Sequence, residues 1–253
     1  MLIALAFLAR PDLSNAQTLA QGMAQAQALT QKDKAELATR ALWQGAYDGD
    51  VAQIRAALDA GVNVDIRDYD GQTPLMTAAV NSPNLEAIKL LLDRNANVNV
   101  ASHDGWTPLM NALLRSDRKS TLLHQIVGLL LSKNASVSVK TRDGYTPVTG
   151  AVMDGDDPEL MRMILAKHPD VDVPTKPYGF TALMYASSYG YLDIAKLLVR
   201  AHAKLDLLDT EGRTALDLTQ PDGFDTPDRA ARKLALGRFL RSKGAHHNNT
   251  RGL

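Results

Sequence analysis

The stretch YGFTALMYASSYGYLDIAKLLVRAHAKLDLL, residues 178–208, decides the fold, because its order of residue types returns along the chain. Its opening at Gly179 has counterparts that begin at Gly71, Gly105, Gly144 and Gly212. In chain order these glycines are 34, 39, 35 and 33 residues apart. A period near 33 residues is typical of stacked supersecondary units, each too small to bury its apolar face alone.

Each unit predicts two short helices followed by an extended segment. In the unit that begins at Gly71, the Thr73 side chain can cap a helix. Pro74 suits the first helical position, because a backbone N–H there would have no partner within the helix and proline has none. Further along, Ile88, Leu91 and Leu92 recur at the i, i+3, i+4 spacing of a buried helical stripe. An extended Val-Asn-Val segment then leads to the next Asp-Gly turn.

Helix ends carry their own signals. Gly61, Asn95 and Asn134 stand just past predicted second helices, where a left-handed backbone favours glycine or asparagine. We therefore predict that the helices end there and the extended segments begin.

The Gly-x-Thr-Pro-Leu opening, the paired leucines and the closing Ala-x-Val-Asn occur together and in order, and in this the chain resembles the ankyrin repeat family. The resemblance covers about four fifths of the chain and is specific for fold, not for function. It implies an all-α solenoid of about six units, counting atypical terminal ones, with short hairpin fingers between the helix pairs.

One family feature is missing. The histidine that commonly follows Thr-Pro-Leu in the family is replaced by Met76, Met110, Thr149, Met184 and Asp217. The resemblance therefore implies somewhat looser packing of the fingers, but no change of fold.

The predicted repeat domain spans residues 40–246, with other segments on either side. Residues 1–16 are a possible signal peptide, because their apolar run is too short to cross a bilayer and Ala16 offers a small residue for cleavage. No Lys or Arg precedes that run, so either the true start lies upstream of Met1 or this is an apolar tail of a cytosolic protein. Residues 17–39 are expected to form an Ala/Gln-rich linker or helical lead-in, 115–121 a mobile insert and 247–253 a disordered tail.

Composition narrows the classes of partner and chemistry. Basic and acidic residues balance at 28 each, which argues against a chain built to bind polyanions or acidic lipid. Hydrophobic residues make up 45% of the chain, enough for a long repetitive core. With no cysteine, disulfides, thiolate zinc sites and cysteine nucleophiles are excluded.

Motifs for catalysis or metal binding are absent from the sequence. It contains no Gly-x-Ser-x-Gly elbow, no phosphate loop and no His-Glu-x-x-His, and its histidines are scattered. His246 and His247 fall in the predicted tail, where we expect them to be solvated. We predict no catalytic residues, no metal, no cofactor and no enzymatic activity.

The residue directly after the glycine of each unit forms the one informative pattern. In order it is Gln72, Trp106, Tyr145, Phe180 and Arg213, so three consecutive units place a large aromatic ring at the same turn-to-helix position. Aromatic side chains in a solvent-facing groove are typical interface anchors, because they bury much area while few rotors are frozen.

In the ankyrin family this position, the two residues before the glycine and the end of the first helix line the concave partner-binding surface. Carried over by position, the resemblance implies a set of partner-binding residues. The set is Trp106, Tyr145, Phe180, Tyr69, Asp70, His103, Asp104, Arg142, Asp143 and Tyr178, with Asn81, Arg115, Asp154 and Tyr189 at the helix ends.

Three alternatives stay open. The rings could instead pack between fingers and only stabilise the stack. The basic residues between 224 and 253 either dock an acidic partner, lipid head groups or nucleic acid, or keep the terminal repeat soluble. An enzyme or small-molecule pocket could also lie between the fingers, roofed by the insert.

We expect a monomer that binds another protein, without nucleic acid and without stable membrane insertion. A cleaved signal peptide would place this chain in a bacterial periplasm or outside the cell, and its absence would place it in the cytoplasm.

Overall fold

The computed structural model describes residues 31–114 and 121–248, and its contacts divide the chain into two compact units. We call Met1–Val100 the N-terminal unit and Ala101–Leu253 the C-terminal unit, and each is described by itself. Across the described residues the regular elements are helices, and the only pairing of extended backbone is the single bridge between Thr175 and Phe180. The predicted all-α repeat fold is confirmed.

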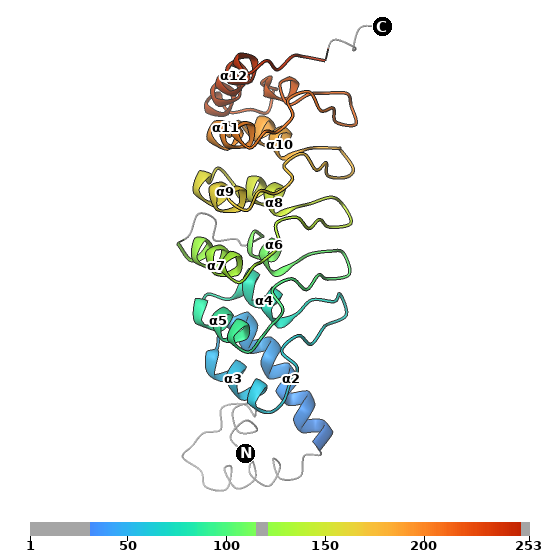
Figure 1. Cartoon of the computed structure of the whole chain (residues 1–253), viewed down its shortest axis with the longest axis vertical. Coiled ribbons are helices and arrows are strands. Elements are labelled where there is room, and N and C mark those ends of the chain that lie inside the picture. The colour runs from blue at the N-terminus through green and yellow to red at the C-terminus, as the bar shows by residue number, and fades with distance from the viewer. Residues whose placement is uncertain (1–30, 115–120, 249–253) are drawn as a thin grey trace. The chain divides into compact units, whose positions relative to one another are not determined.

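The N-terminal unit holds two helix pairs (Figure 1). The first is α2 (Gln31–Asp48) with α3 (Val51–Asp59), and the second is α4 (Pro74–Asn81) with α5 (Leu85–Asp93). Helix α2 begins inside the segment expected to be a linker or helical lead-in, while residues 1–30, including the possible signal peptide, lie outside the described part.

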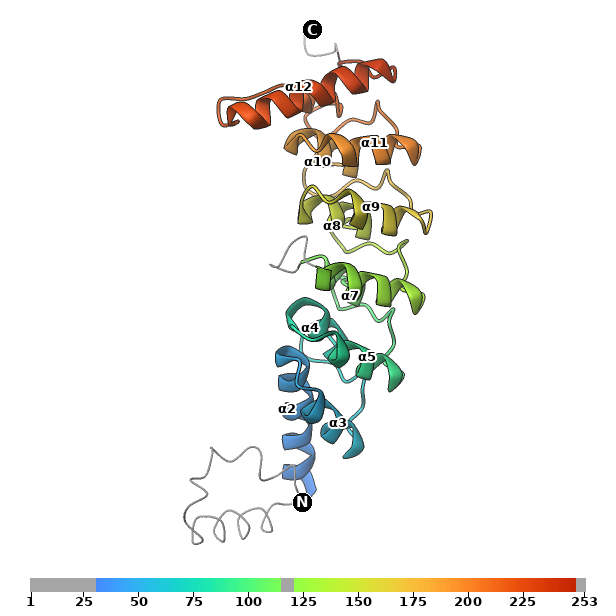
Figure 2. The same cartoon turned by 90° about the vertical axis from the view of Figure 1, so that its left-hand side faces the viewer.

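The C-terminal unit holds the remaining pairs. These are α6 (Pro108–Ala112) with α7 (Thr121–Ser132), α8 (Pro147–Asp154) with α9 (Pro158–Leu165), α10 (Ala182–Tyr189) with α11 (Leu192–Arg200), and the 3-10 turn η1 (Asp217–Thr219) with α12 (Pro227–Ser242). Within this unit α6, α8 and α10 lie on the side of the extended fingers and α7, α9 and α11 lie behind them (Figure 1). After a turn of 90° about the vertical axis, α12 is seen to lie across α10 and α11 (Figure 2).

Helix starts and ends agree with the sequence signals. Thr73 accepts a hydrogen bond from the Met76 N–H at 3.4 Å, and Pro74 is the first residue of α4. Asn95 and Asn134 adopt the predicted left-handed backbone, with φ of 65° and 63°. The stripe of α5 is buried, since the Ile88 and Leu91 side chains have no exposed surface.

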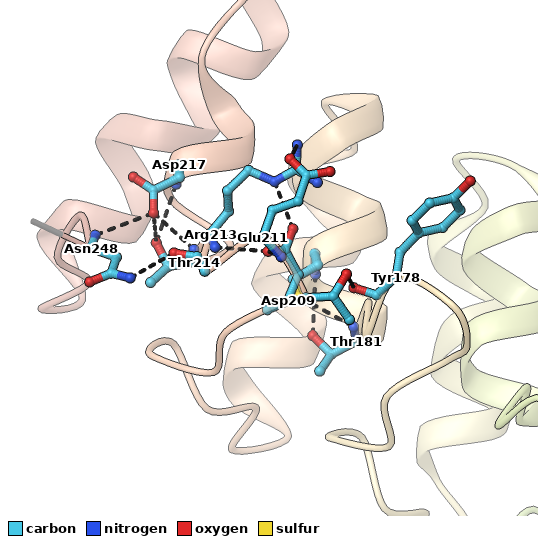
Figure 3. A network of polar contacts seen from close by, with 11 residues as sticks. Tyr178, Thr181, Asp209, Glu211, Arg213, Thr214, Asp217 and Asn248 are labelled. Carbon is cyan, nitrogen blue, oxygen red and sulfur yellow. Dashed lines mark hydrogen bonds and ion pairs between the residues drawn. The ribbon is translucent and has the colours of Figure 1, made fainter. Parts of the chain in front are cut away.

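The last repeat departs most from the pattern of the others. Its Asp217 is at the centre of a network of polar contacts (Figure 3). The Asp217 carboxylate accepts hydrogen bonds from the backbone N–H of Thr214 at 2.8 Å and from that of Asn248 at 3.3 Å, and it lies 2.7 Å from His247 Nδ1. Asn248 also donates to the Gly212 carbonyl at 2.7 Å. His247 and Asn248, which fall in the segment predicted to be a disordered tail, find polar partners on the preceding finger. Residues 249–253 lie outside the described part.

Glycine is required where one finger passes close to the next. Gly144 has φ of +81°, and a Cβ added there would collide with the carbonyl of Pro174. Gly244 has a similar φ of +89°, but nothing lies within 4 Å of its added Cβ. Comparing substitutions at the two positions therefore distinguishes the cost of backbone strain from the cost of the close contact between fingers.

Gly144→Ala should lower the free energy of unfolding by more than Gly244→Ala does. Both variants place alanine in the left-handed region, at about 1–2 kcal/mol each. Only Gly144→Ala adds overpacking against the next finger, roughly a further 1–3 kcal/mol. Urea denaturation followed by circular dichroism measures the difference, and equal losses in the two variants would show that the finger contact is unimportant.

Asp217 should make the last repeat sensitive to acid. Partial burial pushes the Asp217 pKa upward, but hydrogen bonds from Thr214, His247 and Asn248 outweigh it and hold the pKa below its ordinary 3.8. Because the folded-state pKa is the lower one, the ionised carboxylate stabilises the fold above about pH 4, and this is lost as pH falls through the folded-state pKa.

Asp217→Asn should therefore be less stable than the parent at pH 7, with the gap narrowing below about pH 4. Thermal melts across pH 3 to 7 measure this gap, and exposed Asp206→Asn serves as the control with little change. A gap for Asp217→Asn that stays constant down to pH 3 would contradict this role of the carboxylate.

Candidate functional site

The aromatic positions are held by a closure that recurs in every finger. The Trp106 carbonyl accepts from the Ser102 N–H at 2.8 Å, and the Trp106 N–H donates to Ser102 Oγ at 3.1 Å. Thr141 closes the next finger on Tyr145 in the same way, at 2.9 and 3.0 Å. Since the backbone at Trp106 and Tyr145 is bonded through both N–H and carbonyl, the point from which each of these two rings projects is well defined.

The next two fingers close on the same plan with different side chains. Thr175 bonds the Phe180 carbonyl through both its N–H, at 2.9 Å, and its hydroxyl, at 3.1 Å. Asp209 accepts from the N–H of Arg213 at 2.8 Å and from its Nε at 2.7 Å, with the Asp209 side chain fully buried. The carbonyl of the residue after the glycine is therefore bonded in all four fingers of the C-terminal unit, although Thr175 lies five residues before its partner where the other three lie four before theirs.

Two rings of the predicted aromatic row contact each other, and the third contacts other neighbours. Trp106 and Tyr145 stack with ring centroids 6.2 Å apart and an interplanar angle of 22°. Phe180 lies 6.2 Å from Tyr178, and the Arg213 guanidinium lies 5.7 Å from the Phe180 centroid. Such ring pairs contribute about 0.5–1.5 kcal/mol beyond their buried area. All three row positions are half-buried, so they both stabilise the fingers and face solvent.

Tyr185 connects Phe180 to Tyr189. Its ring meets Phe180 edge-on at 5.3 Å and stacks on Tyr189 at 6.4 Å, and its hydroxyl lies 2.9 Å from Thr175 Oγ1. Burial raises the Tyr185 pKa, and the nearby phenol of Tyr145 raises it further, although the hydrogen bond with Thr175 opposes this.

Tyr189 then continues to Tyr191 at 5.4 Å. We call these two groups of contacting rings together the aromatic surface. Its members are Trp106, Tyr145, Tyr178, Phe180, Tyr185, Tyr189 and Tyr191.

Sequence reasoning missed Tyr185 and Tyr191. A signal for Tyr185 was present in the repeat register, where it stands six residues after the glycine and the other units have Thr77, Asn111, Gly150 and Leu218. Because the other units have smaller residues at this register position, the large Tyr185 ring indicates that the position packs differently in this repeat.

Tyr178 is the most open ring of the aromatic surface, with 58% of its surface exposed. Its carbonyl accepts hydrogen bonds from the N–H and hydroxyl of Thr210 at 3.0 and 3.2 Å, so its backbone is tied to the next finger. In Figure 3 the Tyr178 ring points away from the polar network of Asp209, Glu211 and Arg213.

The charged residues of the predicted set lie at the finger turns. Asp104 and Arg142 form an ion pair at 3.1 Å, and both are well exposed. His103 and Asp143 are exposed on the same turns. These residues extend the polar edge of the fingers and do not contact the rings in any described interaction.

The other predicted residues are not brought into this site. Tyr69, which is 99% exposed, Asp70 and Asn81 belong to the N-terminal unit. Arg115 and the side chain of Asp154 lie outside the described part of the structure, as does the insert 115–120.

The basic C-terminal segment is largely paired within itself. Arg229 and Lys233 meet the carboxylate of Asp225 at 2.9 and 2.7 Å, and Lys233 is only 2% exposed. Arg229 also donates to the Ser188 carbonyl at 3.0 Å and lies 5.8 Å from the Tyr189 ring. Arg229 thus fastens α12 to the preceding repeat and Lys233 fastens it to the loop before it, which favours the structural interpretation of this charge.

A second feature is a hollow of about 600 Å³ between fingers of the C-terminal unit, which we call the finger groove. Polar, basic and turn residues line most of it. Its lining is Ser102, His103, Asp104, Gly105, Lys140, Thr141, Arg142, Gly144, Val173, Pro174 and Lys176.

Neither a metal cluster nor a membrane-spanning helix is found in the described residues. No group of three or more His, Asp or Glu side chains there could hold a metal ion. The described helices are all too short or too polar to cross a bilayer.

Two solved structures are similar in fold. One is a chain from the structure of the complex between the Bd0816 predatory endopeptidase from Bdellovibrio bacteriovorus and immunity protein Bd3460, at 25% identity and TM-score 0.61, covering 80% of this chain and 97% of that one. Another is an ankyrin repeat domain from Acinetobacter baumannii, at 25% identity and TM-score 0.64, covering 81% and 98%. No curated protein matches the chain.

The family comparison agrees with the repeating helix pairs and the closed fingers. The model of ankyrin repeats in three copies matches residues 42–141 and 120–209, which together make up well over half of the sequence. The chain belongs to the ankyrin repeat family.

Proposed function

We propose that this protein binds a partner protein through the aromatic surface of its C-terminal unit and that its role is not enzymatic. The observation that carries the proposal is the clustering of seven aromatic rings on the fingers and the α10 repeat of this unit. Trp106 stacks on Tyr145, and a second group of rings runs from Tyr178 to Tyr191 with each ring in contact with the next.

A surface of this kind suits protein recognition for a physical reason. Tyrosine and tryptophan have few rotors to freeze, so ordering them on binding costs little entropy, and their polar edges tolerate water before the partner arrives. The finger closures reduce that cost further because the backbone is already ordered. Arg213 over Phe180 and Arg229 over Tyr189 place cations at the edge of the surface, where charged rim residues are common.

The comparisons support partner binding in general terms. Ankyrin repeats are generally interaction modules, and one similar chain comes from a complex of an endopeptidase with an immunity protein. By analogy we propose that the partner is an enzyme that this chain restrains. The alternative of stabilising or localising the partner would leave the partner's activity unchanged in the complex.

The most informative test uses two tyrosines of similar exposure. Tyr178 on the aromatic surface is 58% exposed, and Tyr47 on α2 is 54% exposed. Tyr178→Ala should weaken partner binding roughly tenfold, as for an interface anchor, while Tyr47→Ala should not. Both variants should melt close to the parent, because removing an exposed side chain costs little stability.

The measurement is capture by the tagged protein from an extract of its source organism, identification of the partner by mass spectrometry, and titration of the purified pair. Replacing Trp106, Tyr145 and Phe180 by Ala together should abolish binding while the protein stays folded at 25 °C. Equal partner affinity in Tyr178→Ala and Tyr47→Ala, together with full binding by the triple variant, would show that the rings only stabilise the fingers.

We also propose export of the protein, on the strength of the apolar run 1–9 and the small residues 14–16. When the chain is expressed in a bacterium, the periplasmic fraction should contain protein whose intact mass lacks residues 1–16. Recovery of only the full-length mass in the cytoplasmic fraction would contradict this proposal.

A further inference from the structure

Backbone hydrogen bonds between fingers set the register of basic side chains in the finger groove. The Arg142 N–H donates to the Asp104 carbonyl at 2.9 Å, and the Lys176 N–H donates to the Asp143 carbonyl at 2.7 Å. Arg142 and Lys176 thus occupy the same place in successive fingers. His103, two residues before its glycine as Arg142 is, holds that place in the preceding finger.

The charge of the groove is positive although the whole chain is neutral. Lys140, Arg142 and Lys176 line it together with one carboxylate, that of Asp104, which gives a net charge of plus two with His103 counted as neutral. Arg142 is paired with Asp104, and both side chains stay well exposed. Among the described residues no carboxylate lies within ion-pair distance of Lys140 or Lys176, and both lysines are exposed.

The extent of the groove favours a chain of carboxylates over a single small anion. Its lining comes from three successive fingers, and neighbouring repeats are about 10 Å apart at helix-packing distance. Side chains on one face of an extended peptide recur about every 7 Å, so acidic residues of one segment can reach cations on several fingers. One phosphate ion could reach only part of this lining.

We propose that the finger groove binds a carboxylate-rich peptide segment of a partner protein. Lys140 and Lys176 supply the unpaired positive charge, and Arg142 offers the planar fork that matches a carboxylate. This site goes beyond the proposed function, because it uses none of the rings of the aromatic surface.

The test uses the full chain and a defined probe, fluorescein-labelled hexaglutamate, with binding followed by fluorescence anisotropy at low salt. Lys140→Gln/Lys176→Gln removes the two unpaired cations of the groove. Lys167→Gln/Lys204→Gln is the matched control, because both of its lysines are exposed in the same unit, lie outside the groove, and change the net charge equally. The melting temperatures of both variants are measured to confirm that they are folded.

The groove variant should bind hexaglutamate roughly fivefold more weakly than the parent, as expected for two lost exposed ion pairs, while the control variant keeps nearly parental affinity. Raising the salt to about 0.5 M should weaken binding to the parent. Labelled hexaglutamine should not bind, and the triple alanine variant of the aromatic surface should still bind hexaglutamate.

Several results would overturn the proposal. Equal losses in the groove and control variants would show a response to net charge only. Undetectable binding of hexaglutamate by the parent would exclude the site, and displacement of the peptide by an equal concentration of inorganic phosphate would assign the groove to small anions. Failure of this test leaves the aromatic surface unaffected, because partner capture by the ring variants is a separate measurement.

Discussion

The closure of each finger on the residue after its glycine is the constraint on which the rest of this structure depends. A glycine with left-handed backbone turns the chain. A Ser, Thr or Asp a few residues before that glycine then forms hydrogen bonds, through its backbone and its side chain, with the residue directly after the glycine. The closure fixes where the first helix of the pair begins, because the capping threonine follows directly. It also brings the turn close enough to bond the neighbouring finger, as the Arg142 N–H does with Asp104.

Both candidate surfaces of the C-terminal unit follow from this repeated closure. A residue type that recurs at one register position becomes a row in space, because successive fingers superpose their closed turns. The position after the glycine produces the row from Trp106 to Phe180, ended by Arg213 stacked on the last ring. The position two or three residues before the glycine produces the row of Arg142 and Lys176. Positions on either side of the glycine thus form two rows, one aromatic and one cationic, which can bind different chemical groups.

The last repeat shows how the same plan adapts when a family residue is missing. Where the family commonly has histidine, Asp217 takes the hydrogen bonds of its own turn and also reaches His247 and Asn248. A carboxylate can accept several such bonds, and ionisation strengthens each of them. Together with the Asp225, Arg229 and Lys233 cluster, this network covers the end of the stack, whose terminal repeat has no following helix pair in the described chain.

The sequence by itself determined the repeat period, the helix pairs and the shared position of Trp106, Tyr145 and Phe180. These depend on local chemistry: threonine caps and proline starts for helices, left-handed Gly61 and Asn95 for their ends, and apolar spacing for the buried stripes. Only the tertiary structure decided that Tyr185 connects Phe180 to Tyr189, that Lys233 is buried, and that His247 packs on Asp217. These features depend on contacts between residues from different helices or fingers. The distance between such residues is set by how the repeats stack, and the order of residues within one repeat does not determine it.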